Sequence, residues 1–177
     1  GLLRLREAVD VPAVAARAIA RGPSSWFRTL TIGVGRRDGI QPGSAVLAPG
    51  GLLGQVYQVS YASSQVLCLV DRLGSVGARL QPERARQVIG VCKGDGTSLC
   101  TLVYSNANAD VRPGDAVVTS GQEQGSLFPP GLLIGHVVSI ERRPDQSSLV
   151  CHIRPAVDPD LAEEVLVLTP GTPEGRS

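Results

Sequence analysis

Few residues in this chain could carry acid–base or nucleophilic chemistry, and the two histidines, His136 and His152, are the first candidates. A serine-hydrolase triad would combine one of them with a carboxylate such as Asp115 or Asp158 and with a serine. No serine lies in a nucleophile motif such as G-x-S-x-G, and both histidines fall within predicted strands. Two histidines without a cysteine cluster also do not supply a metal site. The sequence therefore predicts no enzyme, no catalytic residue, no cofactor and no bound metal.

A group of carboxylates near the C-terminal end, formed by Asp158, Asp160, Glu163 and Glu164, is a second candidate for chemistry. Aromatic residues make up only 3% of the chain. That is too few to line a sugar-stacking cleft or a nucleobase platform. We therefore interpret these carboxylates as the solvated face of a turn.

The glycine-rich stretch Gly33-Val-Gly35-Arg-Arg-Asp-Gly39 is superficially similar to a phosphate-binding loop. It is not G-x-G-x-x-G, no Gly-Lys-Ser/Thr follows it, and no helical pattern succeeds it. The stretch is better interpreted as a turn between strands.

The charge of the chain is nearly balanced, with 17 basic against 16 acidic residues and a net charge of +1. The chain as a whole therefore lacks the basic surplus typical of proteins that bind nucleic acid or anionic lipid. We expect its partners to be proteins. No run approaches the 18 or more apolar residues needed to span a bilayer.

Four cysteines, Cys68, Cys92, Cys100 and Cys151, contain no C-x-x-C pair, which argues against a zinc or thioredoxin-like site. Cys92 and Cys100 flank a turn-like stretch and could face each other across a hairpin. Cysteine also serves as a small buried hydrophobe. Both alternatives, a disulfide and free buried thiols, stay open.

The first ten residues place Leu2, Leu5 and Val9 on one helical face, and Pro12 then ends the pattern. They are either the end of a longer helix, such as a coiled coil, or a frayed terminus. Methionine is absent even at position 1. We therefore expect a preceding segment, which could have been a membrane anchor.

From residue 11 onward, short β-like runs alternate with Gly and Pro, and helical content should be small. The predicted strands are 13–20, 27–35, 45–48, 52–60, 65–71, 76–81, 87–93, 98–105, 116–120, 132–141, 149–157 and 165–169. Strands of this length and spacing favour small barrels or sandwiches.

Part of this pattern occurs twice. Each copy has a Pro-Gly turn before a strand and then a Gly-Leu-Leu element: Pro42, Gly43, Gly51 and Gly54 in the first copy, and Pro113, Gly114, Gly131 and Gly135 in the second. Pro fixes φ and Gly accepts positive φ in such a turn, and the later glycines fit sharp bends at barrel corners. Two copies predict two similar barrels with a boundary near residues 72–75.

Several elements in the same order resemble the rod shape-determining protein MreC family. The residues that carry the resemblance are 16–30, Gly35-Arg-Arg-Asp38-Gly39-Ile40, Gly51-Leu-Leu53-Gly54-Gln-Val56, Ser64-Gln-Val66-Leu, Asp71, Gly114-Asp115-x-Val-Val-Thr119-Ser120-Gly121 and Phe128-Pro129-Pro130-Gly131-Leu-Leu-Ile134-Gly135-x-Val137. The resemblance covers nearly the whole chain. The loop 122–127 is one residue longer than is usual in the family.

The resemblance implies a fold of two six-stranded β-barrels of chymotrypsin-like topology without catalytic residues. Residues 1–10 would end a coiled coil, 11–74 would form the first barrel, 75–169 the second, and 170–177 a disordered tail. The last strand of the second domain could pack on the first. The loop containing Leu127 and Phe128 is either a barrel plug or a contact for a partner protein.

The resemblance also implies a bitopic protein of the bacterial inner membrane whose barrels lie outside the cytoplasm. It would be a non-enzymatic scaffold that dimerises or assembles further. Its expected partners are the class B penicillin-binding protein of elongation and the MreD, RodA and MreB complex, to which the scaffold would link that penicillin-binding protein. Two alternatives stay open: a peptidoglycan-binding module and a protease-like hydrolase.

Overall fold

The computed structural model describes residues 11–22, 28–121 and 128–169. Over these residues the chain forms twelve strands: β1 (Ala13–Arg21), β2 (Thr29–Ile32), β3 (Ala45–Ala48), β4 (Gly51–Val59), β5 (Ser64–Cys68), β6 (Ser75–Leu80), β7 (Ile89–Gly94), β8 (Cys100–Tyr104), β9 (Ala116–Thr119), β10 (Leu133–Arg143), β11 (Ser148–Pro155) and β12 (Glu164–Leu168). Three single 3₁₀ turns, η1 (Arg36–Asp38), η2 (Glu83–Ala85) and η3 (Pro144–Gln146), are the helical elements of these ranges. None of the helical segments described could cross a bilayer.

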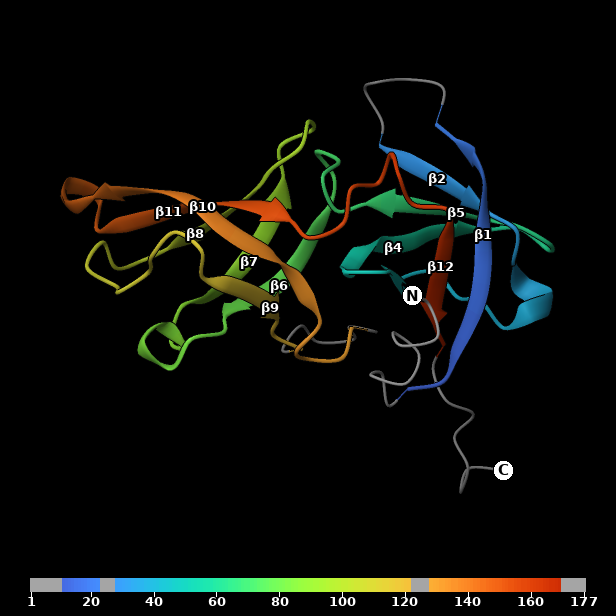
Figure 1. Cartoon of the computed structure of the whole chain (residues 1–177), viewed down its shortest axis with the longest axis horizontal. Helices are drawn as coiled ribbons and strands as arrows, with labels where there is room; N and C mark the ends of the chain where they lie inside the picture. The colour runs from blue at the N-terminus through green and yellow to red at the C-terminus, as the bar shows by residue number, and fades with distance from the viewer. Residues whose placement is uncertain (1–10, 23–27, 122–127, 170–177) are drawn as a thin grey trace.

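The strands close into two antiparallel barrels of six strands each, which lie side by side (Figure 1). The first has the order β1-β12-β3-β4-β5-β2, and the second has the order β10-β11-β8-β7-β6-β9. This confirms the predicted all-β class and the two six-stranded barrels. The likeness to chymotrypsin stays a prediction.

Successive side chains of an extended strand point to opposite faces, so buried and more exposed residues alternate along it. In β5, Ser64, Val66 and Cys68 are buried in the first barrel, whereas Gln65 and Leu67 are partly exposed. β3 differs, since all four of its residues are buried. It lies next to the junction of the barrels, so both of its faces are covered.

The two Pro-Gly turns adopt the same local structure in both barrels. Gly43 has φ 89° and Gly114 has φ 93°, a conformation that favours glycine. The N–H of Gly43 donates to the carbonyl of Val56, and the N–H of Gly114 donates to the carbonyl of Val137, both at 2.7 Å. These hydrogen bonds fix the position of β4 against the first turn and of β10 against the second.

Two of the other repeated glycines allow strands to approach closely. A Cβ on Gly54 would clash with the carbonyl oxygen of Leu67, and a Cβ on Gly135 would clash with that of Arg154. A larger residue at either position would push apart two neighbouring strands of a closed barrel. The remaining repeated glycines, Gly51 and Gly131, occupy different positions. Gly51 is the first residue of β4, whereas Gly131 lies in the turn before β10.

The last strand crosses from one barrel to the other. β12 pairs with β1 and β3, so it closes the first barrel although it follows the second in the chain. Figure 1 shows β12 beside β1, far from the strands that immediately precede it. The connection between β11 and β12, residues 156–163, therefore runs across the junction of the barrels. It positions the groove described below.

One continuous hydrophobic cluster extends through both barrels and their junction. At the junction, the N–H of Gly96 donates to the carbonyl of Val70 at 2.8 Å, and the N–H of Gly94 donates to that of Gly74 at 3.0 Å. A Cβ on Gly94 would clash with the backbone of residues 69–71. Backbone meets backbone directly at these two glycines, and buried side chains of the cluster fill other parts of the junction, so the two barrels are closely packed against each other.

Candidate partner-binding groove

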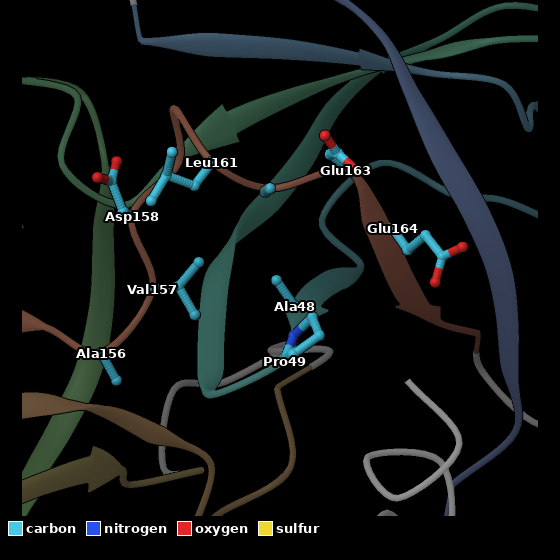
Figure 2. Close-up of a pocket in the computed structure, with 9 residues that line it drawn as sticks. Ala48, Pro49, Ala156, Val157, Asp158, Leu161, Glu163 and Glu164 are labelled. Atoms are coloured by element: carbon cyan, nitrogen blue, oxygen red, sulfur yellow. The ribbon is translucent and has the colours of Figure 1, made fainter. Parts of the chain in front are cut away.

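A groove of about 460 Å³ lies at the junction, between the connection 156–163 and the end of β3 (Figure 2). Its apolar lining consists of Ala48, Pro49, Ala156, Val157, Leu161 and Ala162. Val157 and Ala162 are each only 6% exposed, whereas Leu161 is 75% exposed. A large apolar side chain so exposed beside a concave apolar surface is typical of sites that bind other proteins.

The charged residues that line the groove are all acids: Asp158, Glu163 and Glu164. Figure 2 shows Glu164 at the far end, directed away from Val157 and Leu161. There its carboxylate lies 3.6 Å from the guanidinium of Arg17, and both side chains are exposed. Such an exposed pair adds little stability. The groove thus combines an apolar floor with an acidic rim.

Two arginines from the first barrel hold the connection in place. Arg21 donates from Nη2 to the carbonyls of Asp160 and Ala162, at 2.8 and 2.7 Å. Arg28 pairs with the carboxylate of Asp160 at 3.2 Å and donates to the carbonyl of Thr97 in the second barrel at 2.8 Å. Arg28 therefore joins the connection to both barrels, and the groove is a preformed feature of the fold.

Asp71 stabilises the same corner from the first barrel. Its carboxylate accepts the backbone N–H of Arg28 at 2.6 Å and that of Leu73 at 2.8 Å. Asp71 is only 1% exposed, and these hydrogen bonds satisfy a carboxylate that burial would otherwise penalise. Asp71 thus anchors the segment that leads into the second barrel.

Two of the candidate residues for chemistry, Asp115 and His152, have charged neighbours on other elements. Asp115 is engaged by Arg84, at 2.5 and 2.7 Å, and by the backbone N–H of Arg112 at 2.8 Å. These partners lower the pKa of the Asp115 carboxyl, the hydrogen bond from Arg84 most of all. His152 faces Glu141, with 3.9 Å between Nε2 and Oε2. No group of three or more metal ligands occurs among the described residues.

All four cysteines are buried free thiols. Burial raises the pKa of Cys68 to about 12 and that of Cys151 to about 11. The pKa of Cys92 is also raised, chiefly by its hydrogen bond with Cys100 and by burial. Gly94 pairs with Cys100 and Cys92 with Leu102, so the two cysteines are diagonal rather than direct neighbours. The second of the two alternatives left open by the sequence, free thiols, is the one observed.

The loop proposed as a partner contact is described only from Phe128 onward, and Leu127 lies outside the described residues. Phe128 is 8% exposed and packs between the barrels, near Leu52 of the first and Val76 of the second. A ring so buried offers little surface to a partner, so the proposal below does not use it. Residues 1–10 and 170–177, predicted as the end of a coiled coil and as a tail, also lie outside the described residues.

Sequence reasoning interpreted the carboxylates of residues 158–164 as a solvated turn and missed the groove beside them. Asp160 pairs with Arg28, and Glu163 and Asp158 line the groove. The available signal was Leu161, an apolar residue within an acidic turn. Its role depends on Ala48 and Pro49, more than 100 residues earlier in the chain, which only the closed barrel brings near.

A match to a known protein family identifies the group of proteins to which this chain is related. Residues 18–169 match the family model described as "Rod shape-determining protein MreC, barrel core". The chain belongs to the MreC family. The MreC resemblance found in the sequence is thereby confirmed.

Relatives and solved structures agree with this assignment. The cell shape-determining protein MreC of Cereibacter sphaeroides is 34% identical over 119 residues, covering 67% of this chain and 38% of that protein. The chain spans 38% to 59% of the length of these curated MreC relatives. A solved MreC structure superposes with a TM-score of 0.86 at 27% identity, covering 94% of this chain and 93% of that one.

A further structural likeness concerns a complex. MreC from Helicobacter pylori has been solved together with the penicillin-binding protein PBP2. Its TM-score to this MreC-family chain is 0.64 at 12% identity, covering 89% of this chain and 99% of that one. The likeness is one of fold.

Proposed function

We propose that this chain is a non-enzymatic scaffold of the bacterial cell-elongation machinery and that its inter-barrel groove binds the elongation penicillin-binding protein. The observation that carries the proposal is the exposed Leu161 above a preformed apolar floor. Membership of a cell shape-determining family and the PBP2 complex of a protein with this fold support it. A rigid groove binds a partner without an ordering cost of its own.

The acidic rim of the groove would favour partner segments that carry positive charge. Asp158 and Glu163 would attract a partner segment that carries basic residues next to an apolar side chain. Rim charges act mainly on the association rate and its dependence on salt. The apolar contact of Leu161 and Val157 would supply most of the affinity.

We propose a wider role that membership of the MreC family supports. The scaffold self-associates, is anchored in the inner membrane by a segment preceding this chain, and presents its barrels outside the cytoplasm. It links the penicillin-binding protein to RodA, MreD and MreB.

The test is a titration of the ectodomain of the cognate penicillin-binding protein with this chain, followed by a biosensor. We expect saturable binding that Leu161→Glu weakens at least tenfold, because a charge would be buried against Val157 and the partner. The matched control is Val103→Glu, which places the same charge on an exposed valine of β8 in the second barrel. Equal effects of the two variants, or no saturable binding, would contradict the proposal.

A further inference from the structure

Two turns are packed together at the end of the first barrel that lies away from the second barrel (Figure 1). One contains η1 and the other joins β4 to β5. The backbone N–H groups of Arg36 and Arg37 donate to the carbonyls of Ser60 and Tyr61, at 2.8 and 3.0 Å. A Cβ on Gly35 would clash with the Ser60 carbonyl, so this close contact requires glycine. The two turns therefore form one rigid surface.

Two guanidinium groups converge on one aromatic ring at this surface. The Cζ of Arg36 lies 6.0 Å and that of Arg37 5.9 Å from the centroid of the Tyr61 ring. Tyr61 is 62% exposed, and the side chain of Arg37 is 55% exposed. Attraction between each cation and the ring holds together two like charges that would otherwise repel each other. We name Arg36, Arg37 and Tyr61 the Arg–Tyr platform.

The positive charge of this platform is only partly balanced. Asp38 is the nearby carboxylate, with Oδ2 3.8 Å from Nε of Arg37. The same oxygen accepts the N–H of Gly35 at 2.9 Å, so its main role is to close the turn. Arg36 has no ion pair among the described residues. The two cations and one anion leave a local surplus of one positive charge, which the balanced charge of the whole chain conceals.

We propose that the Arg–Tyr platform binds a phosphate group of an anionic ligand. A guanidinium fork pairs with two oxygens of one anion. A tetrahedral phosphate presents oxygens on more than one side and can accept both Arg36 and Arg37. Binding also relieves the repulsion between the two guanidinium groups. The phosphate belongs either to a lipid headgroup or to a soluble molecule.

The platform and the groove are separate features of the first barrel. The groove is lined by the end of β3 and the connection 156–163 at the barrel junction, and the platform lies at the opposite end of β4. A phosphate ligand and a protein partner could therefore be bound at the same time. The inference does not depend on the proposed function of the groove.

Two probes distinguish the sources of phosphate. Cosedimentation compares vesicles of phosphatidylglycerol and phosphatidylcholine with vesicles of phosphatidylcholine alone. Calorimetric titration with inorganic pyrophosphate tests a soluble phosphate. We expect binding to at least one probe, to be weakened by added salt because the contact is an exposed ionic one. Binding only to the anionic vesicles identifies a lipid headgroup, and binding to pyrophosphate identifies a soluble ligand.

The double variant Arg36→Gln/Arg37→Gln should weaken binding roughly tenfold or more, since each arginine contributes an ionic contact. Tyr61→Leu should weaken it less, by releasing the guanidinium groups. The control, Arg86→Gln/Arg143→Gln, removes the same charge from exposed arginines of the second barrel. Thermal unfolding confirms that each variant is folded. Absence of binding to both probes, or an equal loss in the control, would overturn the proposal.

Discussion

The two barrels place equivalent strands in the same circular order but obtain one strand from different parts of the chain. Starting from the strand after the Pro-Gly turn, the first barrel runs β3-β4-β5-β2-β1-β12 and the second runs β9-β10-β11-β8-β7-β6. Five of the six pairs of equivalent strands follow the same sequence order. The sixth pair does not, because β6 begins the second barrel whereas β12 ends the chain. The second barrel is therefore complete in itself, and the first is not.

The repeated turn shows a second difference at one position. The carbonyls of Ser44 and Asp115 accept the N–H groups of Val56 and Val137, both at 2.9 Å, so the two residues are equivalent. The hydroxyl of Ser44 is buried without a hydrogen-bond partner, whereas the carboxylate of Asp115 is paired with Arg84. The same backbone structure is thus supported by a side chain in only one barrel. The Pro-Gly backbone alone is sufficient to form the turn.

The largest expected effect concerns β12. A fragment of residues 11–74 lacks this strand and leaves the edges of β1 and β3 unpaired, so we expect it not to fold cooperatively. A fragment of residues 75–155 contains all six strands of the second barrel and should fold, with lower stability than the whole chain. Far-UV circular dichroism with thermal unfolding measures both.

A rearranged first barrel sharpens this prediction. Ala13 pairs with Leu168, so these two residues are adjacent in space. Residues 164–168 can therefore be joined to residues 13–74 by a two-residue Asn-Gly turn, which suits an antiparallel hairpin. We expect this permuted fragment to fold. Cooperative unfolding of the unpermuted fragment 11–74 would show that β12 is dispensable.

A smaller effect is expected at the repeated turn. Asp115→Ala leaves the Arg84 guanidinium without its carboxylate and the Arg112 N–H without an acceptor, and should lower Tm by roughly 5 °C. Ser44→Ala removes a hydroxyl that has no partner, and should leave Tm unchanged or slightly higher. Calorimetry of both variants at neutral pH makes the comparison. A larger loss for Ser44→Ala than for Asp115→Ala would contradict it.

The last expected effect is absent at neutral pH and appears only at alkaline pH. The pKa of Cys68 in the folded chain is about 12, above the ordinary value of 9.0. The stability contributed by its buried neutral thiol is therefore complete below pH 9 and is lost as the pH rises from 9 toward 12. In that window the free energy of unfolding should fall by about 1.4 kcal/mol per pH unit for this thiol.

The Cys68→Ala variant should lack this part of the slope. The comparison is made by urea unfolding of both proteins between pH 8 and about pH 11. The second barrel contains three buried thiols, and Cys151→Ala is the matched variant there. The stability contributed by the Cys151 thiol should be lost by about pH 11, because its pKa in the folded chain is about 11. Parallel pH profiles for wild type and Cys68→Ala would refute the assignment.

Much of the fold could be predicted from the sequence, because strands and turns are set by local pattern. The predicted strand 45–48 coincides with β3, and 116–120 exceeds β9 by one residue. The poorest agreement is the predicted strand 27–35, of which β2 forms only residues 29–32. There Gly33 and Gly35 lead into η1, whose packing on the β4–β5 turn no local pattern encodes.

The candidate binding surfaces could not be predicted in the same way. The sequence contained Leu161, Arg36, Arg37 and Tyr61 as isolated residues, without a spacing that joins them. Leu161 meets Ala48, and Tyr61 meets Arg36, only after the barrels close. Phe128 was proposed as either a plug or a contact, and its burial likewise depends on both barrels.

By itself the sequence determined the strands, the duplicated Pro-Gly turns and the family, because each depends on residues close together in the chain or on their order. The tertiary structure alone decided that β12 completes the first barrel. The continuous apolar run of residues 165–168 specifies a buried strand, but it does not specify against which neighbours that strand packs. β12 pairs there because β1 and β3 would otherwise have unpaired edges. To reach them, the connection 156–163 crosses the junction of the barrels, where it lines the groove.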